Sequence, residues 1–279
     1  MNPPNENIVT GAPIRAKAYS ERQIGAVNWL GVWTLYTKEV QRFLKVTLQT
    51  VLAPAVTAIL FFAIFTVAFG GSSRAVGDIP FSQFLVPGLI MMAIIQNSFA
   101  NTSSSLLIAK VQGTIVDVLM PPLSAGELTT AIAMGGLSRG VLVAASVALP
   151  LLPFVEITLY HPLVAIYYAV SASLLLSLMG MLGGIWADKF DHMAAITNFV
   201  IMPLSFLSGT FYSITKLPEV WQTVCQFNPF FYMIDGFRYA FIDHSDGPIG
   251  KGMVIMFCLN AALWLVCHQV FKKGYRLKP

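Results

Sequence analysis

Only one group of residues in this sequence has the types and spacing of a catalytic or metal-binding cluster. Asp188, Asp191 and His192 supply two carboxylates and an imidazole, and the four-residue step from Asp188 to His192 would place both on one helix face. A metal site needs further ligands, which no neighbouring residue supplies. A solvated turn therefore explains the group better than a metal site, and we expect neither a metal nor a catalytic residue in this chain.

Nucleotide hydrolysis and ion coupling also lack the residues that they need. The stretch 135–140, Gly-Gly-Leu-Ser-Arg-Gly, has neither the length nor the lysine of a phosphate-binding loop. No Asp or Glu lies deep in the long apolar stretches, where a pump or secondary transporter usually binds its coupling ion. We expect that the chain does not hydrolyse ATP by itself and binds no cofactor.

Two polar features nevertheless stand in apolar surroundings. Arg139 interrupts a long apolar stretch, at a cost of roughly 2.5 to 3.5 kcal/mol if it lies centrally in a membrane helix. It either faces a dimer interface or polar cavity, where an anionic headgroup or a carbonyl-rich helix break would meet it, or it pairs with another helix. Asp235 and Arg238 are three residues apart and can pair on one helix face.

The composition shows what kind of protein must position these residues. Of the 279 residues, 56% are hydrophobic and 11% are charged, against about 25% charged in soluble domains. Five stretches of at least 20 residues contain no Asp, Glu, Lys or Arg, and a sixth contains only Arg139. Because about 20 apolar residues cross a bilayer as a helix, the sequence predicts an all-α membrane protein. Its six transmembrane helices fall within 46–73, 79–109, 128–155, 157–187, 192–215 and 252–271.

Positively charged residues are divided unequally between the two sides that six spans create. Twelve Lys and Arg fall on the side of both termini and four on the other, so the positive-inside rule predicts cytoplasmic termini. The net charge of +4 is explained by residues beside the membrane, and we expect no nucleic-acid partner. Residues 1–27 are expected to be a flexible cytoplasmic N-terminus without a cleavable signal peptide, and residues 272–279 a basic cytoplasmic tail.

Residues 28–45 have the pattern of an amphipathic helix. Apolar and aromatic residues recur at three- and four-residue steps on one side, and polar and basic residues occupy the other. The first set is Trp29, Trp33, Tyr36, Val40 and Phe43, and the second is Lys38, Gln41, Arg42 and Lys45. This composition predicts a helix lying in the inner membrane interface. A helix packed on a cytosolic partner, without lipid contact, is the alternative.

The stretch 111–120 precedes two prolines that cannot continue a helix, Pro121 and Pro122. Ser124 and Glu127 then have the spacing of a capping box, which begins the third span. A short helix held parallel to the membrane at a rigid corner fits this pattern and would suit a docking element that transmits force. A plain interhelical turn is the alternative.

The segment between the fifth and sixth spans is too long for a turn and too apolar for a free loop. Asn228-Pro229 divides 218–242 into two helices that are too short to span a membrane, and the second is rich in aromatic residues. Two half-helices that dip back into the outer leaflet fit this composition. A pair of amphipathic helices lying on the surface is the alternative.

Several of these motifs, in this order, resemble the permease subunit of ABC-2 type exporters. They are Leu119-Met120-Pro121-Pro122-Leu123-Ser124 with Glu127, Leu207-Ser208-Gly209-Thr210-Phe211-Tyr212, Leu217-Pro218, Asn228-Pro229 and Arg238. The likeness covers nearly the whole chain. It is similar in particular to the small six-span permeases of the nodulation-factor and polysaccharide exporter branch.

The resemblance implies roles for two segments. The helix at 111–120 would be the coupling helix that sits in the nucleotide-binding subunit, and the helices at 218–242 would be the family's extracellular re-entrant hairpin. The residues expected to couple to the ATPase are Val111, Thr114, Asp117, Val118, Leu119, Met120, Pro121 and Pro122. Those expected to line or gate the substrate path are Arg139, Phe230, Phe231, Asp235 and Arg238.

We therefore expect residues 46–271 to form an ABC-2 transmembrane domain in a bacterial inner membrane. The chain would be the permease subunit of an ATP-driven exporter, paired with a second copy of itself, surrounded by membrane lipid and bound to two copies of a separate ABC ATPase that holds ATP and Mg. The expected substrate is amphipathic, such as a lipid-linked glycan, a lipo-oligosaccharide or a hydrophobic drug, and is moved out of the cytoplasm or inner leaflet. The alternative is a pore or lipid scramblase that works without nucleotide.

Overall fold

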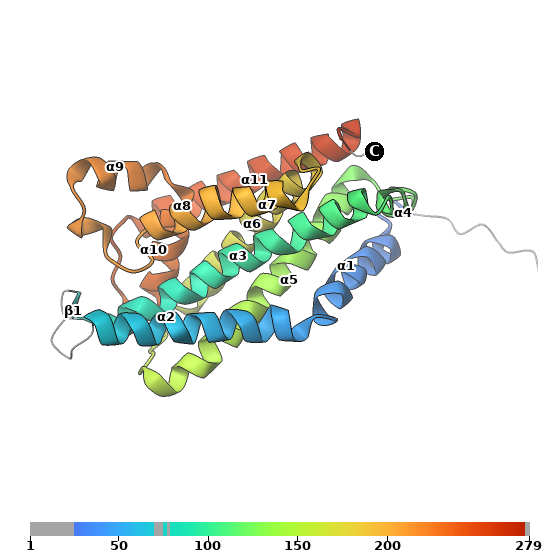
Figure 1. The fold of residues 1–279 in the computed structure, drawn as a ribbon. Helices are drawn as coiled ribbons and strands as arrows, with labels where there is room; N and C mark the ends of the chain where they lie inside the picture. The colour runs from blue at the N-terminus through green and yellow to red at the C-terminus, as the bar shows by residue number, and fades with distance from the viewer. Residues whose placement is uncertain (1–24, 70–74, 77–78, 277–279) are drawn as a thin grey trace, which may run out of the picture.

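The computed structural model describes residues 25–69, 75–76 and 79–276, and these residues are almost all helical (Figure 1). Between α2 and α3, the strands β1 (Ala75–Val76) and β2 (Ile79–Pro80) form a two-residue antiparallel ladder. The α-helices are α1 (Trp29–Leu44), α2 (Ala53–Phe69), α3 (Phe81–Val111), α4 (Ile115–Leu119), α5 (Ala125–Leu151), α6 (Pro162–Trp186), α7 (Phe190–Ile196), α8 (Met202–Leu207), α9 (Glu219–Phe227), α10 (Pro229–Ile242) and α11 (Ile249–Lys273). The expected flexible stretch 1–27 lies mostly outside the described residues.

Six helical segments within the described residues are long and apolar enough to cross a membrane. A π-helical turn, η1 (Leu48–Leu52), begins the first of them, and a second, η3 (Thr197–Ile201), joins α7 and α8 into the fifth. The segments are Leu48–Ala68, Phe81–Val111, Ala125–Phe154, Pro162–Trp186, Phe190–Leu207 and Ile249–Lys273. The predicted class, an all-α membrane protein with six transmembrane helices, is therefore confirmed.

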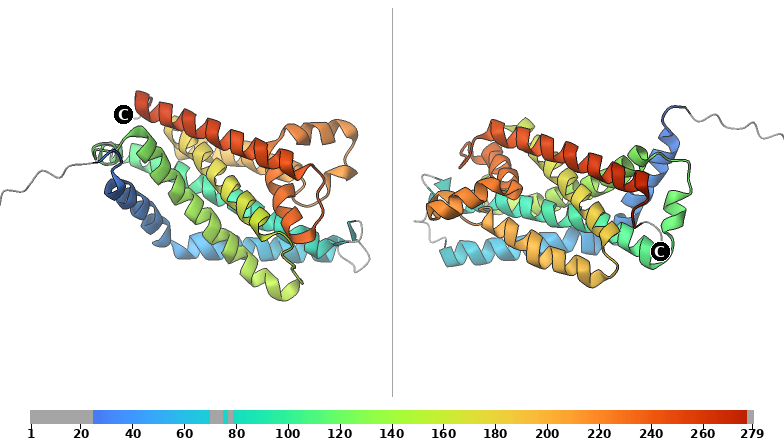
Figure 2. Two further views of the ribbon diagram at one scale, coloured as in Figure 1. Left: turned by 180° about the vertical axis from the view of Figure 1, so that it is seen from behind. Right: turned by 90° about the horizontal axis from the view of Figure 1, so that it is seen from above.

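The helices form an elongated bundle with two distinct ends (Figures 1 and 2). The start of α1, α4 and the end of α11 lie together at one end, which we name the terminal end. The β1 strand, α9 and α10 lie at the other, which we name the hairpin end. The expected break at Asn228 is present, since α9 ends at Phe227 and α10 begins at Pro229.

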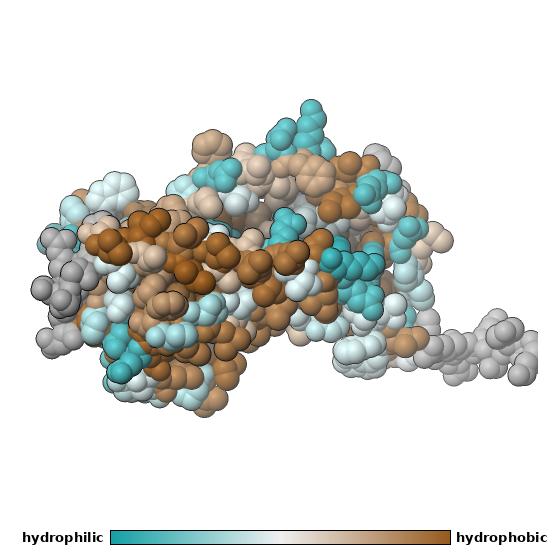
Figure 3. All heavy atoms as spheres, turned by 60° about the horizontal axis from the view of Figure 1, so that its bottom comes forward, coloured by the Kyte–Doolittle hydropathy of each residue, from teal (hydrophilic) through white to brown (hydrophobic). Residues whose placement is uncertain are grey.

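α3 is the central helix of the bundle and α2 is one of the most exposed. Every residue of α3 from Phe84 to Ile95 is buried, and the helix packs against α2, α5, α6 and α10. α2 instead exposes a stripe of large apolar side chains at three- and four-residue steps, which suits contact with lipid. They are Val56, Leu60, Ile64 and Val67. Figure 3, which brings the lower side of Figure 1 forward, shows broad apolar areas on the surface.

Glycines and small polar residues let α3, α5 and α6 approach closely. Gly136 of α5 faces Thr102 of α3 and Ser177 of α6, while Gly180 and Gly184 of α6 face the backbone of α3. The pattern Gly-x-x-x-Gly is typical of close helix packing in membranes, and the sequence leaves open whether the packing is within one chain or between two. In this structure, these glycines pack helices of the same chain against one another.

This packing predicts that Gly184→Ala destabilises the protein. An added Cβ would stand 2.7 Å from the carbonyl oxygen of Ser103, and a backbone atom cannot turn aside. Overpacking costs typically about 1–3 kcal/mol, which exceeds the gain of about 1 kcal/mol from alanine's higher helix propensity. We expect a lower apparent midpoint of thermal unfolding for the purified variant in detergent.

Gly183→Ala is the matched control, one residue away on the same helix. Its Cβ would stand 3.2 Å from Cε of Met193, the far end of a flexible side chain. We expect an unchanged or higher midpoint for this variant. Equal midpoints for the two variants would contradict the close packing of α6 against α3.

Candidate functional site

The corner between the second and third spans contains the predicted coupling element, and its helix is shorter than expected. α3 continues through Val111, and Gly113, whose φ of +72° favours glycine, separates it from α4 (Ile115–Leu119). The helix predicted at 111–120 is therefore two pieces, because the chain turns at Gly113. Val111 belongs to the second span and Thr114 is the residue before α4.

α4 has one buried and one exposed side. Ile115 and Val118 are 1% and 6% exposed and pack into the apolar cluster between the helices at the terminal end. Asp117 and Met120 lie on the exposed side. Pro121 and Pro122 follow without helical structure and are also exposed. A short helix anchored on one face therefore presents its other face at the end of the bundle.

Glu127 joins this corner to α1 through two backbone hydrogen bonds. Its Oε2 accepts from the N–H of Ser124 at 2.6 Å, and the Ser124 side chain accepts from the N–H of Glu127, so the predicted capping box is present. Its Oε1 accepts from the N–H of Asn28, also at 2.6 Å, at the start of α1. One carboxylate thus binds backbone donors at the starts of two helices, where negative charge is favoured.

Asn28 strengthens the same connection. Its Oδ1 accepts from the N–H of Gly31 and caps α1, while its Nδ2 donates to the carbonyl oxygen of Pro122 at 3.2 Å. The start of α1, the double-proline corner and the start of α5 are therefore held together by side chains that bind backbone. This connection links residues 94 and 99 positions apart in the sequence, and no local pattern in the sequence signals it.

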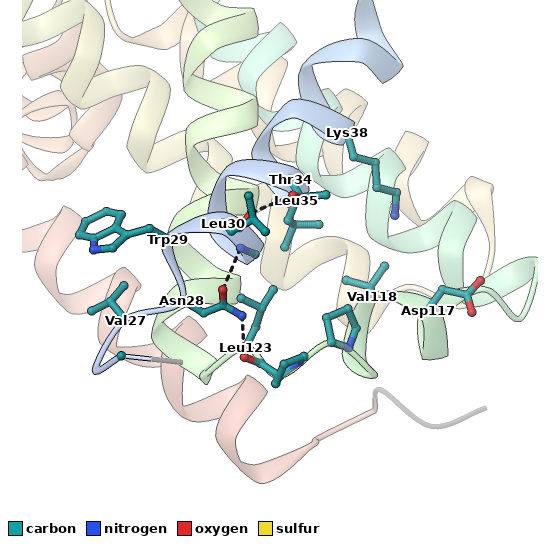
Figure 4. A pocket seen from close by; sticks show the side chains of 14 residues that line it. Val27, Asn28, Trp29, Leu30, Thr34, Leu35, Lys38, Asp117, Val118 and Leu123 are labelled. Carbon is teal, nitrogen blue, oxygen red and sulfur yellow. Dashed lines mark hydrogen bonds between the residues drawn. The ribbon is translucent and has the colours of Figure 1, made fainter. Parts of the chain in front are cut away.

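A groove of about 550 Å³ lies between the start of α1 and the α4 corner. Figure 4 shows Lys38 and Asp117 at one end of the groove and Val27 and Trp29 at the other. Leu35, Val118 and Leu123 contribute to its apolar lining. The groove thus combines an apolar lining with one basic and one acidic side chain at one end.

The polar face predicted for α1 is partly wrong. Glu39 is 2% exposed and Arg42 is 28% exposed, and both side chains bond to α3. Arg42 donates to Asn101 and Ser104 of α3, and Ser105 donates to Glu39 at 2.8 Å. The two charges pair with each other at 3.2 Å, and this pairing with further hydrogen bonds offsets the cost of burying them. Trp29 and Trp33, in contrast, are exposed.

Asp188 forms an ion pair with Lys110, which also bonds to the end of α6. Lys110 donates from Nζ to the carbonyl oxygens of Ile185 and Ala187, at the end of α6, and pairs with Asp188 at 3.3 Å. The hydrogen bond and positive charge of Lys110 lower the pKa of Asp188. Within the described ranges, no group of three His, Cys, Asp or Glu side chains could hold a metal ion.

The residues expected to line the substrate path lie in two separate places. Phe230 and Phe231 are 1% and 2% exposed in the core at the hairpin end. Arg139 is on α5, beside a cavity between η1, α2 and α3, where its Nη2 donates to Oδ1 of Asn97 at 3.1 Å. The structure therefore does not bring Arg139 together with the aromatic residues of α10.

Asp235 and Arg238 do not form the predicted ion pair with each other, because each bonds to the backbone of a different loop. Asp235 accepts from the N–H groups of Asp246 and Gly247 at 2.8 and 3.0 Å. Arg238 donates from Nη2 to the carbonyl oxygen of Gly209 at 2.7 Å and lies over the Phe84 ring, 3.7 Å from its centre. Both side chains are buried, but each holds a different loop because these loops carry backbone groups that need partners.

Together, these features define a multi-pass helical membrane protein in which Glu127 and Asn28 hold the α4 corner to α1 and α5, and in which α10 is buried at the hairpin end. Its sequence matches the family described as ABC-2 type transporter over residues 31–242. The chain belongs to this family of transport permeases.

Known relatives agree with this assignment. The chain is 34% identical over 250 residues to a protein of Escherichia coli K12 named inner membrane transport permease YadH, covering 90% of this chain and 98% of that protein. It is 25% identical over 255 residues to nodulation protein J of Rhizobium leguminosarum bv. trifolii, covering 86% and 93% of the two chains. The resemblance to ABC-2 type permeases is therefore confirmed, and the rhizobial relative is consistent with the nodulation-factor and polysaccharide exporter branch.

The shared carboxylate predicts that Glu127→Ala loosens two helix starts at once. Loss of one cap costs about 0.5–2 kcal/mol, and here two backbone donors lose their acceptor. We expect faster amide hydrogen exchange, measured by mass spectrometry, in the first turns of both α1 and α5. Glu127→Gln retains one side-chain oxygen and should give an intermediate effect.

The exposed residue Glu156 supplies the control, since Glu156→Ala removes the same charge at a distance from the corner. We expect wild-type exchange in both helix starts for this variant. Faster exchange in α5 alone after Glu127→Ala would show that the bond to Asn28 does not hold α1.

The contacts of Arg238 predict that Arg238→Met destabilises the loop that follows α8. The carbonyl oxygens of Gly209 and Thr210 lose a donor, and a buried acceptor without a partner costs about 1–3 kcal/mol. We expect a lower apparent unfolding midpoint in detergent, together with faster proteolysis at 208–213. Lys216→Met, which removes an exposed cation from the same segment, should leave both measurements unchanged. Wild-type stability of Arg238→Met would contradict this role.

Proposed function

We propose that this chain is the permease subunit of an ATP-driven exporter in a bacterial inner membrane. The observation that supports the proposal best is the corner at α4, whose exposed face is anchored from behind by Ile115 and Val118. A subunit that transmits force needs such a docking element, and the bond of Glu127 to the start of α1 adds a second helix to it. Nucleotide hydrolysis would occur in a separate ABC ATPase, which supplies ATP and Mg.

The proposed orientation places the terminal end in the cytoplasm. Twelve of the Lys and Arg residues belong to the side that holds both termini, and the positive-inside rule assigns such a side to the cytoplasm. The groove between α1 and α4 would then face the ATPase, with Lys38 and Asp117 available for charged contacts. α9 and α10 would lie toward the outer leaflet as a re-entrant hairpin.

The proposed assembly has two copies of this chain and two copies of the ATPase. The proposed cargo is amphipathic, such as a lipid-linked glycan, a lipo-oligosaccharide or a hydrophobic drug. The name of the Escherichia coli relative supports transport at the inner membrane, and that of the rhizobial relative refers to nodulation. Phe230, Phe231, Asp235 and Arg238 would act at the exit by holding the hairpin in place.

The coupling role predicts that Asp117→Lys uncouples ATP hydrolysis from transport while the permease remains folded. Asp117 is exposed on the docking face, so reversing its charge changes the contact with the ATPase without disturbing the core. We expect at least a tenfold loss of ATP-dependent transport in reconstituted vesicles and weaker co-purification with the ATPase. Deletion of 113–118 should abolish both.

Glu219→Lys is the control, because it reverses an exposed acidic residue at the hairpin end. We expect wild-type transport and co-purification for this variant. If Asp117→Lys and the deletion both retain transport and co-purification, the proposed docking role is wrong. Transport by the wild-type chain in vesicles that contain neither ATPase nor nucleotide would favour the alternative of a pore or scramblase.

A further inference from the structure

Arg139 is a partly buried charge with few hydrogen bonds in the described part of the chain. Only its Nη2 has a hydrogen-bond partner, the amide oxygen of Asn97, and its Nε has none. Gln96, on the same cavity, has a buried Nε2 that also lacks a partner. A buried donor left without an acceptor costs about 1–3 kcal/mol, and more when it is charged. Nε of Arg139 and Nε2 of Gln96 are therefore hydrogen-bond donors without an acceptor in this structure.

None of the described residues that line the cavity beside Arg139 has a carboxylate that could serve as this acceptor. Its volume is about 270 Å³, and its lining residues belong to η1, α2, α3 and α5. Among its described lining residues, Arg139 is the one charged side chain. The nearby Arg42 adds a second cation, but Glu39 pairs with it. An anion entering the cavity would thus meet an unopposed guanidinium, which binds phosphate and carboxylate well.

The cavity is polar at one end and apolar at the other. α2 runs from the terminal end toward the hairpin end, and α3 runs in the opposite direction. Gln49 of η1 and Gln96 and Asn97 of α3 therefore lie on the side of the cavity toward the terminal end, whereas Phe61 of α2 and Leu89 of α3 lie on the side toward the hairpin end. Phe61 follows Gln49 by twelve positions, which correspond to about 18 Å along a helix. The polar end faces the terminal end of the bundle.

We propose that this cavity binds the anionic head of an amphiphile, a phosphate or carboxylate group, with its first chain carbons in the apolar end. A volume of about 270 Å³ corresponds to about nine water molecules of liquid. It holds a head and a short piece of chain, so the rest of the molecule lies outside it. Arg139 and Gln96 donate to the head, and Ala58 and Phe61 contact the chain. This inference rests on the proposed function and narrows its substrate class.

Binding of dodecyl phosphate to the purified, full-length permease tests the proposal. The protein is delipidated in an uncharged detergent, and the bound molecules are counted by native mass spectrometry across a titration. We expect the wild-type chain to bind dodecyl phosphate and Arg139→Gln to bind it at least tenfold more weakly. Arg139→Lys, which keeps the charge but loses the planar fork, should be intermediate.

Lys251→Gln is the matched control because it removes one exposed cation at the hairpin end. We expect wild-type affinity for this variant. Gln96→Leu and Ala58→Leu test the two ends of the cavity, and each should weaken binding at least threefold. If size-exclusion chromatography shows that Arg139→Gln does not fold, these two variants still test whether the cavity binds dodecyl phosphate. Wild-type affinity in both would overturn the proposal.

Two further ligands separate an amphiphile site from other anion sites. Dodecylphosphocholine has the same chain with a zwitterionic head, and equal binding of it would show that the head charge is not recognised. Inorganic phosphate supplies the head without the chain. If it displaces dodecyl phosphate at a similar concentration, the cavity is a site for free anions. Either result would overturn the proposal.

The binding measurement uses neither ATPase nor nucleotide, so it fails independently of the proposed function. If dodecyl phosphate does not bind but ATP-dependent transport is observed, the proposed binding site is wrong and the proposed exporter function is unaffected. If dodecyl phosphate binds as expected while Asp117→Lys and the 113–118 deletion leave transport unchanged, the proposed binding site is supported and the proposed coupling role is wrong.

Discussion

A backbone N–H or carbonyl group that is cut off from water must find a partner inside the protein, and several charged side chains of the described residues provide one. Glu127 accepts from the starts of α1 and α5, and Lys110 donates to carbonyl oxygens at the end of α6. Arg238 holds the loop after α8, and Asp235 holds the loop before α11. Helix ends and loops are the places where regular hydrogen bonding stops, so the charges concentrate there.

This placement has a mechanical consequence at the terminal end. α1 is joined to the corner by Asn28 and Glu127, and to α3 by the Glu39 and Arg42 pair. Gly135 of α5 leaves room for Glu39, since an added Cβ would stand 2.6 Å from the Glu39 Cβ. A displacement of α4 would therefore be transmitted to α1 and α5 together. These connections are hydrogen bonds and an ion pair, so they do not require any contact of the exposed apolar side chains with lipid.

Sequence patterns predicted those features of the fold that depend on neighbouring residues. Span lengths follow from apolar stretches, the capping box from Ser124 and Glu127, and the break at Asn228 from the following proline. The partners of Glu39, Arg42, Asp235 and Arg238 were not predictable, because each bonds to backbone or side chains of another helix or loop. The helical wheel placed Arg42 on the polar face, opposite the aromatic residues, but it shows which residues share a face and not what that face meets.

The exposed position of α2 bears on how the proposed headgroup would reach the cavity beside Arg139. In the most apolar 18-residue stretch of each span, 17% of the residues are buried in the span that contains α2, against 78% in the span formed by α3. Moving α2 away from the cavity therefore disrupts fewer contacts than moving α3. η1 at its start already departs from regular α-helical bonding, and such π-helical turns occur often at functional sites. The cavity thus has one wall, α5, that carries the charge and another, α2, that few contacts hold in place, so a headgroup would reach Arg139 most easily by displacing α2.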